Sequence, residues 1–473
     1  MTTHITRRQF LLGTGSLLAL GCASWLGLVA GRTSPAGPEQ TPAAEVPPPE
    51  PSPIPCHYIF RHGLIVDGSG GKPYLGDLGI RGDRIVAVGD FRAAPGAVEI
   101  DARGLVVCPG FIDVHTHTED YLAAGGRAEM LLLQGVTTHL GGNCGSSVKD
   151  VGAFLSGINR LAINLGILAG YRVLREAAVT QEGRRARANE VAAMQEKLAG
   201  ALKEGAFGLS VGLEYWPQYL ATTQELVELC QVLKEYGGFY ATHIRSEGDR
   251  VLEAVKEAIE IGERAGVPVE YSHVKAAGQR NWGKMALVLN LLDEARRSGL
   301  DITADVYGYT FSSNDLGSGR SSIKEEDMLL ALKHPAVMVG SDSGLDEQGR
   351  AVHPRAYGNY PRILRRYCLD QGIITLEESV HKMTLMPARR LGLNDRGLLA
   401  EGYKADVVAF DPEVITDKAT RPNPNQMAIG VRWVMVNGQI AVKEGQPTGC
   451  FAGEVLKGGR RLLAINHRPV ATS

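Results

Sequence analysis

Six residues of metal-binding type recur through the middle of the chain, and most of them follow a short apolar run. They are His115, His117, Cys144, His243, His273 and Asp342. Imidazole and thiolate are the ligands that Zn²⁺ prefers, and a carboxylate can complete a catalytic site that keeps one position open. Two of the histidines are two residues apart, so a strand would turn both to the same side. The set predicts a catalytic metal centre rather than isolated histidines packed in a core.

The spacing of these residues predicts the elements that hold them. Strand ends placed at eight positions are separated by 29, 27, 42, 30, 30, 32 and 37 residues, the positions being His115, Cys144, Tyr171, Leu213, His243, His273, Asp305 and Asp342. Eight strand–helix units of this length are typical of a (β/α)8 barrel of the TIM type, whose catalytic groups gather at the C-terminal strand ends. An open doubly wound sheet fits less well, because no Gly-rich phosphate turn follows an early strand. The predicted fold class is α/β.

Short β-branched runs separated by Gly and Asp turns flank the barrel sequence on both sides. They lie at 58–60, 64–66 and 84–88 before it, and at 405–410 and 431–436 after it. Neither half has enough strands to bury a core, so we expect one small β-sandwich built from both ends, with the barrel inserted between them. The predicted boundaries are 57–105 and 397–457 for the sandwich and 106–396 for the barrel.

The first 31 residues have the layout of an export signal. Arg7 and Arg8 precede an uncharged stretch from Gln9 to Gly31, and Thr-Arg-Arg-Gln-Phe-Leu resembles the twin-arginine signature. A Pro-rich linker over 32–56 follows, and a tail occupies 458–473. We expect an exported protein, periplasmic or extracellular, without a lasting membrane partner unless the signal is retained as an anchor or Cys22 is lipidated.

The composition excludes several classes of protein. The chain has 473 residues, 44% of them hydrophobic, and a formal net charge of −2. An apolar fraction of this size excludes general disorder, and a near-neutral balance argues against nucleic acid as the main partner. Seven cysteines in so long a chain do not form a disulfide scaffold. A small-molecule substrate is the expected partner.

Several motifs identify a resemblance to a known family. Pro109-Gly110-Phe111-Ile112-Asp113-Val114-His115-Thr116-His117 resembles the first-strand signature of the amidohydrolase superfamily. The motifs that narrow the resemblance to the N-acyl-D-amino-acid deacylases (D-aminoacylases) are Gly142-Asn143-Cys144-Gly145, Thr242-His243-Ile244-Arg245, Ser272-His273-Val274-Lys275, Gly340-Ser341-Asp342 and His353-Pro354-Arg355. The likeness spans nearly everything from Tyr58 to Leu456.

The resemblance implies how the ligand residues are divided. Cys144, His243 and His273 would hold one tightly bound zinc ion, leaving a position for water. A second, weaker or empty site would be formed by His115, His117 and Asp342. Asp342 is also expected to carry the proton between the attacking water and the leaving nitrogen. The implied reaction is hydrolysis of an N-acyl-D-amino acid to a carboxylate and a D-amino acid.

The substrate's α-carboxylate needs a cation near the metal. Lys275 and Arg245 each stand two residues beyond a ligand histidine, so both are expected at the same mouth. The alternative for Arg245 is an ion pair with Glu247 or Asp305. The family resemblance adds Tyr307 and Ser312 or Ser313 to the carboxylate site.

Two features leave the identity of the substrate undecided at the level of the sequence. Asp305 and Asp342 are only 37 residues apart, which shortens the loop that shapes the side-chain pocket in family members with long loops. A cyclic-amide hydrolase of the dihydroorotase or hydantoinase kind, or a D-dipeptidase, is an alternative on the same barrel. The first of these normally carries a metal-bridging lysine at strand four, and 208–213 contains none. A binding protein without catalytic activity is disfavoured, because all six ligand positions carry residues of metal-binding type.

Overall fold

The computed structural model describes residues 52–459, except Glu182 and Gly319. The predicted export signal, the linker up to Pro51 and the tail from residue 460 lie outside the described residues. Among the helices described, none combines the length and the apolar character needed to cross a membrane.

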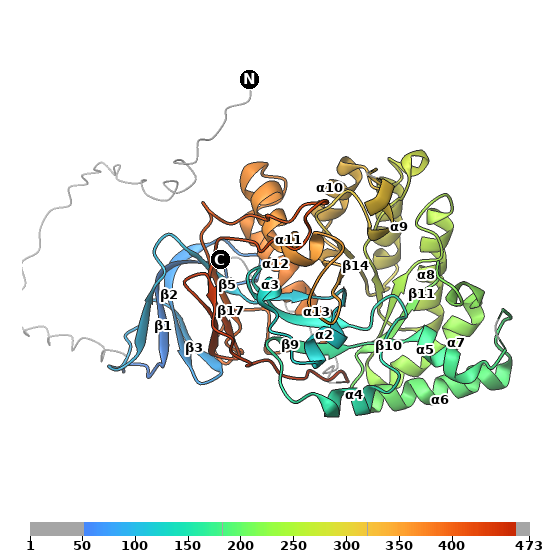
Figure 1. The fold of residues 1–473 in the computed structure, drawn as a ribbon, viewed down its shortest axis with the longest axis horizontal. Helices are drawn as coiled ribbons and strands as arrows, with labels where there is room; N and C mark the ends of the chain where they lie inside the picture. The colour runs from blue at the N-terminus through green and yellow to red at the C-terminus, as the bar shows by residue number, and fades with distance from the viewer. Residues whose placement is uncertain (1–51, 182, 319, 460–473) are drawn as a thin grey trace, which may run out of the picture. The chain divides into compact units, whose positions relative to one another are not determined.

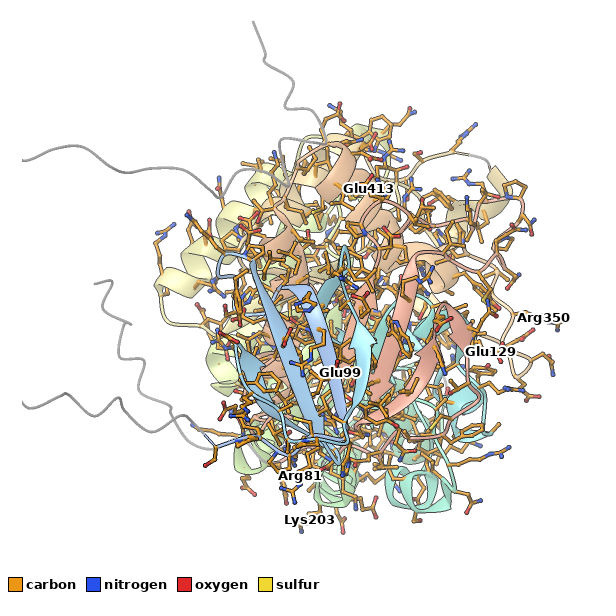
Figure 2. All side chains as sticks on the ribbon, turned by 90° about the vertical axis from the view of Figure 1, so that its left-hand side faces the viewer. Arg81, Glu99, Glu129, Lys203, Arg350 and Glu413 are labelled. Atoms are coloured by element: carbon orange, nitrogen blue, oxygen red, sulfur yellow. The ribbon has the colours of Figure 1, made fainter. Side chains whose placement is uncertain are left out.

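Strands from both ends of the chain form one mixed, mainly antiparallel sheet (Figure 1). Its strands in the described chain are β1 (Tyr58–Ile65), β2 (Tyr74–Arg81), β3 (Arg84–Gly89), β4 (Val98–Asp101), β5 (Val106–Pro109), β17 (Val407–Phe410), β18 (Val431–Val436), β19 (Gln439–Lys443) and β20 (Gln446–Pro447). The two halves join where β5 pairs with β17, Val107 opposite Ala409. Figure 2 shows the blue and red strands side by side, with Glu99 on the blue half. The prediction that both ends build one β-structure is confirmed.

Eight parallel strand positions follow in chain order and form the barrel wall. They are β6 (Phe111–Asp113), β8 (Val136–Gly141), β9 (Asn164–Ile167) continued by β10 (Ala169–Gly170), β11 (Gly208–Gly212), β12 (Phe239–His243), β13 (Val269–Tyr271), β14 (Ile302–Val306) and β15 (Val337–Val339). Beyond the ends of β15 and β6, the Asp342 N–H donates to the His115 carbonyl at 2.9 Å. Two short strands, β7 (Thr116–His117) and β16 (Ser343–Gly344), also pair there. The predicted α/β barrel is therefore confirmed in strand order and direction.

Gly110 divides a run that the sequence suggests is one strand. The segment before it, β5, belongs to the mixed sheet, and the segment after it, β6, belongs to the barrel. A Cβ at Gly110 would lie 2.2 Å from Thr137 Oγ1, so a side chain has no room there. The chain can pass from one sheet to the other at this point because the residue is glycine.

Helices cover the barrel strands on the outside (Figure 1). The longer ones are α6 (Ala188–Glu204), α7 (Thr223–Tyr236), α8 (Val251–Ala265), α9 (Met285–Arg297) and α10 (Glu325–Lys333). Shorter helical segments complete the shell: α2 (Glu119–Ala123), α3 (Glu129–Leu132), α4 (Val151–Gly157), α5 (Tyr171–Ala178), α11 (Arg355–Arg362), the π-helical turn Ile363–Asp370, α12 (Leu376–Met383) and α13 (Leu385–Leu391). Helix α8 buries Val251, Val255 and Ile261 against the core, as expected of an amphipathic helix that covers a barrel.

Candidate active site

The six predicted ligand residues meet at the C-terminal end of the barrel. Each lies at or just after a strand: His115 after β6, His117 in β7, Cys144 after β8, His243 at the end of β12, His273 after β13 and Asp342 after β15. Cys144, His273 and Asp342 have positive φ angles of 53°, 37° and 51°. Residues other than glycine seldom adopt this conformation, and where they do it commonly marks a functional site. These turns aim the three side chains back over the barrel mouth.

The donor atoms of Cys144, His243 and His273 lie as close together as ligands of one ion. Cys144 Sγ is 3.6 Å from His273 Nε2 and 4.0 Å from His243 Nδ1, and the two nitrogens are 3.0 Å apart. Zn–S and Zn–N bonds of ordinary length in a tetrahedral site would separate these atoms by about 3.3–3.6 Å. The three side chains therefore fit a zinc ion. His115 Nε2 lies 3.4 Å from the same sulfur, and the donor atoms of His115, Cys144 and His273 lie within 4.8 Å of one another.

A second group of donors adjoins the first. Asp342 Oδ1 lies 3.5 Å from His117 Nε2 and 3.6 Å from His115 Nε2, and all three donor atoms lie within 4.8 Å of one another. The close donor groups among the described residues include His115 with Cys144 and His273 as well as His115 with His117 and Asp342, so the division of ligands that the resemblance implies stays a prediction. Cys144 stands between the groups, because its sulfur reaches His115 as well as His273.

Three carboxylates lie at hydrogen-bond distance from the outer nitrogens of three histidines, that is, from the ring nitrogens that are not among the metal donors. Asp305 Oδ2 lies 3.2 Å from His115 Nδ1 and Glu247 Oε1 lies 2.9 Å from His273 Nδ1. Glu214 Oε2 lies 3.2 Å from His243 Nε2. A carboxylate at the outer nitrogen keeps the proton there and leaves the inner nitrogen as an electron-pair donor to a metal.

The charge states of the site also suit a cation. Burial by itself would raise the pKa of the Cys144 thiol, but the imidazoles of His115, His117 and His243 bring this pKa well below its ordinary value. Burial would likewise raise the pKa of Asp342, whereas the Arg355 guanidinium and the neighbouring imidazoles hold it well below the usual range. A thiolate and a carboxylate thus face the same small volume.

Lys275 lies where the substrate-binding prediction requires it, although not as a free charge. Its Nζ is buried and donates to Glu247 Oε1 at 2.6 Å. The same oxygen accepts from His273 Nδ1, so Lys275 and His273 share one carboxylate. Lys275 borders the cavity that contains the metal donors.

The prediction that Arg245 faces the same mouth is wrong. Its guanidinium binds Glu257 at 2.7 and 2.8 Å and donates to the carbonyls of Tyr219 and Ala221, both at 2.9 Å. The two-residue alternation that motivated the prediction requires the strand to continue, but β12 ends at His243. Neither partner expected for Arg245 from the sequence is the observed one.

The other residues predicted to bind the substrate's carboxylate lie near Arg355, an arginine that was not among the predicted site residues. Arg355 is buried, and its Nη2 contacts Asp342 Oδ2 at 2.7 Å and Ser313 Oγ at 3.1 Å. Its Cζ stands 4.7 Å from the Tyr307 ring centroid. Within the described part of the chain, Arg355 Nε, Arg355 Nη1 and the Tyr307 hydroxyl have no hydrogen-bond partner. Ser312 borders the cavity but donates its hydroxyl to Asp315 at 2.7 Å.

Unpaired buried donors of this kind indicate a place for an anionic ligand. Arg355 belongs to the His-Pro-Arg motif that carries part of the family resemblance, and this motif is the one signal in the sequence that pointed to it. Glu247, Asp305 and Glu214 gave no such signal, because a lone acidic residue has no distinguishing pattern.

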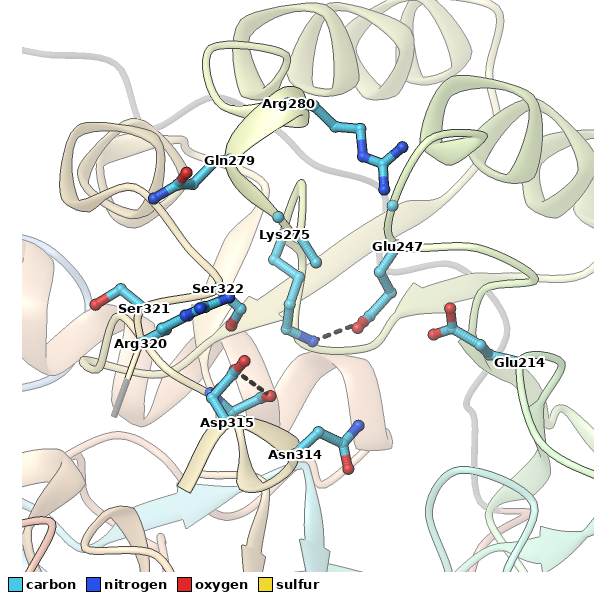
Figure 3. A pocket seen from close by; sticks show the side chains of 14 residues that line it. Glu214, Glu247, Lys275, Gln279, Arg280, Asn314, Asp315, Arg320, Ser321 and Ser322 are labelled. Carbon is cyan, nitrogen blue, oxygen red and sulfur yellow. Dashed lines mark hydrogen bonds and ion pairs between the residues drawn. The ribbon is translucent and has the colours of Figure 1, made fainter. Parts of the chain in front are cut away.

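Two adjoining cavities open over these residues. One, of about 570 Å³, is bordered by metal donors, by Lys275 and by Arg355. The other, of about 1040 Å³, shares Glu247, Lys275, Ser312 and Asn314 with the first and is otherwise lined by polar or small residues. Figure 3 shows the ion pair between Lys275 and Glu247, two of the residues that line both cavities.

Comparisons with known proteins agree with this geometry. Residues 106–441 match the model of the Amidohydrolase family. The chain is 35% identical to a D-aminoacylase from Alcaligenes xylosoxydans xylosoxydans, over 85% of this chain and 98% of the relative. It is 34% identical to an N-acyl-D-glutamate deacylase from the same organism, over 82% and 94%.

Among solved structures, those of D-aminoacylases and related deacylases are similar to this chain. A D-aminoacylase structure concerned with a binuclear metal centre, one-metal activation and second-metal attenuation superposes with a TM-score of 0.80 at 33% identity, covering 85% of this chain and all of the other. An N-acyl-D-glutamate deacylase from Bordetella bronchiseptica, complexed with zinc and a phosphonate mimic of the tetrahedral intermediate, gives 0.77 at 32% identity, with the same coverage. Dihydroorotases are only 25% identical or less, and a D-hydantoinase structure at 18% identity shares the fold alone.

Proposed function

The chain belongs to the amidohydrolase family, and on that premise we propose that it is a zinc-dependent deacylase of N-acyl-D-amino acids. The reaction is hydrolysis of a linear amide to a carboxylate and a D-amino acid. One observation carries the proposal above the others: the Cys144, His243 and His273 donors lie beside a buried cationic corner formed by Lys275 and Arg355.

The metal site and its supporting residues have distinct roles in this proposal. A zinc ion held by Cys144, His243 and His273 would polarise the amide carbonyl and lower the pKa of a water molecule. Glu247 keeps the His273 ring oriented through its hydrogen bond at Nδ1. His115, His117 and Asp342 would form a second, weaker site.

Asp342 is the proton carrier. As water adds to the amide carbon, Asp342 Oδ1 accepts a proton, and the same oxygen returns it to the nitrogen when the C–N bond breaks. Arg355 holds Oδ2 at 2.7 Å, so the carboxylate keeps one oxygen fixed and the other turned toward the histidines. The contact with the Arg355 guanidinium favours the ionised form of Asp342, in which it can accept a proton.

The α-carboxylate of the substrate is recognised at the cationic corner. Lys275, Arg355 and the Tyr307 hydroxyl supply the positive charge and hydrogen-bond donors, with Ser312 at the edge. With the carboxylate fixed there and the carbonyl fixed at the metal donors, inverting the α-carbon would exchange the positions of its hydrogen and its side chain. The site therefore distinguishes D from L configuration.

The proposal is tested with three substrates of one amino acid. Purified zinc-loaded protein is expected to hydrolyse N-acetyl-D-methionine much faster than its L-enantiomer or its D methyl ester. Equal rates for the enantiomers, or an ester cleaved as fast as the free acid, would contradict the carboxylate site. Dihydroorotate and a hydantoin serve as comparison substrates for the cyclic-amide alternative.

We further propose export by the twin-arginine route, supported by Arg7, Arg8 and the uncharged stretch after them. This route transports folded proteins, which suits a metal that is bound before export. Replacing both arginines by lysine is expected to leave the protein in the cytoplasm, as measured by cell fractionation. Unchanged delivery would indicate the general secretory route.

A further inference from the structure

The loop between β11 and α7 exposes three aromatic side chains within five residues. Tyr215, Trp216 and Tyr219 are 41%, 48% and 47% exposed. The Trp216 and Tyr219 rings are neighbours, with centroids 5.5 Å apart. Large aromatic surfaces gathered beside a cavity usually mark the place where a ligand packs.

This aromatic loop borders the cavity that contains the metal donors. Tyr215 and Trp216 both line it, together with Cys144 and His243. The Tyr215 ring lies 4.6 Å from the His243 ring, and its hydroxyl is 3.4 Å from His243 Nδ1. A group attached to a carbonyl carbon at the metal donors therefore lies beside the Tyr215 ring, in the cavity that Trp216 also lines.

Strand order decides which part of the substrate faces the loop. The cations of the carboxylate site come from the segments after β13 and β15, which carry Lys275 and Arg355. The aromatic loop follows β11, and its neighbours in the cavity, Ser146 and Arg172, follow β8 and β10. These two groups of strands lie on different sides of the barrel wall. With the carboxylate on one side and the scissile carbonyl at the metal donors, the acyl group extends toward the other side.

The loop is held in place before any ligand binds. Gln218 is buried; its Oε1 accepts from the Gly212 N–H at 2.7 Å and its Nε2 donates to the Cys144 carbonyl at 3.0 Å. Arg245 donates to the Tyr219 carbonyl, while Glu257 fixes its guanidinium. A rigid loop loses little conformational entropy on binding, so its exposed rings form a preorganised surface.

We propose that Trp216, supported by Tyr219, is a specificity-determining subsite for the acyl group, and that the enzyme prefers N-acyl-D-amino acids with an aromatic acyl group over the N-acetyl compounds. This inference rests on the proposed deacylase function. Arg245 is then a positioning residue for this loop.

The test measures kcat/KM for N-phenylacetyl-D-methionine and N-acetyl-D-methionine in the same preparations. The wild-type ratio is expected to favour the phenylacetyl compound. Trp216→Ala should lower this ratio by about 10-fold, the scale of one aromatic contact, whereas Trp216→Phe should retain most of it. Tyr74→Ala is the matched control, because Tyr74 is an equally exposed aromatic on β2 of the mixed sheet; its ratio should equal the wild-type value.

A second measurement does not depend on a variant. Phenylacetate should inhibit the wild-type reaction at lower concentration than acetate does. An unchanged ratio in Trp216→Ala, a wild-type preference for the acetyl compound, or equal inhibition by the two acids would overturn the inference while the deacylase function stands. Hydrolysis of neither substrate by the zinc-loaded wild type would overturn the proposed function, and this inference with it.

Discussion

An acidic residue lies at the ring nitrogen of each histidine of the Cys144 group that faces away from the sulfur. Glu247 supports His273 and Glu214 supports His243, while Asp305 supports His115. At the scale of single residues, the site is therefore a set of donors and an outer set of carboxylates.

Removing the thiolate is expected to remove the metal. Cys144→Ala should lose most of its zinc on dialysis, because the thiolate is the one anionic ligand of the tight site. Glu247→Gln keeps all three donors and should weaken zinc binding by about 10- to 100-fold. Zinc content and chelator competition measure both effects, with His115→Ala as the control that should retain the tight ion. Full zinc retention in the Cys144 variant would contradict the assignment.

Lys275 and Asp342 should differ in their kinetic effects. Lys275→Met removes a charge-assisted hydrogen bond to the substrate carboxylate, so kcat/KM should fall by about 10- to 150-fold, mainly through KM. Asp342→Asn removes the proton acceptor, so kcat should fall strongly. Steady-state kinetics on protein of verified zinc content separates the two. A Lys275 variant with unchanged KM would place the carboxylate elsewhere.

At the scale of elements, a buried lysine links helix α12 to strand β15 and to the residues just before that strand. Lys382 Nζ donates to the carbonyls of His334 at 2.5 Å and Val337 at 2.8 Å. Burial lowers the pKa of Lys382 to about 8, and Glu378 offsets only part of this effect. The neutral amine can still make both hydrogen bonds, so deprotonation does not break the contact.

The lowered pKa predicts a pH-dependent stability. Between pH 8 and the ordinary lysine pKa of about 10.4, the unfolded chain binds more protons than the folded one at this site, so Lys382 stabilises the fold increasingly as pH rises. The free energy of unfolding of the wild type, minus that of Lys382→Met, should therefore increase across this range. Chemical denaturation at several pH values measures the difference. A difference independent of pH would show that the lysine titrates normally.

At the scale of the whole molecule, a buried polar cluster ties the mixed sheet to the barrel. Asp406, just before β17, accepts from the Asn437 N–H at 2.7 Å and from Asn164 Nδ2 of barrel strand β9 at 3.2 Å. Its Oδ2 also contacts Arg396 Nη1, and Arg396 and Asp406 are both buried. One side chain thus joins residues that lie 10, 31 and 242 positions away from it in the sequence.

Breaking this cluster should destabilise the fold. Asp406→Ala leaves the buried Arg396 with the half-exposed Glu454, at 3.1 Å, as its remaining ion-pair partner, which should lower the free energy of unfolding by about 3 kcal/mol. The matched control is Asp101→Ala, which removes the carboxylate of the exposed Arg103–Asp101 pair and should leave stability unchanged. Urea unfolding of both variants provides the comparison. Equal stability of the two would mean that the cluster does not join the sheet to the barrel energetically.

The sequence determined the parts of this protein that depend on local pattern. The period of apolar runs predicted the barrel strands, since parallel strands buried on both faces need continuous apolar segments. The positions of His115, Cys144, His243, His273 and Asp342 at the strand ends predicted the metal donors, because a barrel brings such ends together.

Only the tertiary structure decided the features that depend on the path of the chain beyond the strands. The alternation rule stops at His243, so Arg245 turns to Glu257 and the aromatic loop instead of the substrate. The paired carboxylates and the surroundings of Arg355 become visible only when separate loops meet: His243 and Glu214 are 29 residues apart, Arg355 and Ser313 are 42 apart, and His115 and Asp305 are 190 apart. Pairwise contacts of this kind leave no periodic trace in a single sequence, because each partner is an ordinary polar residue until its neighbour is known.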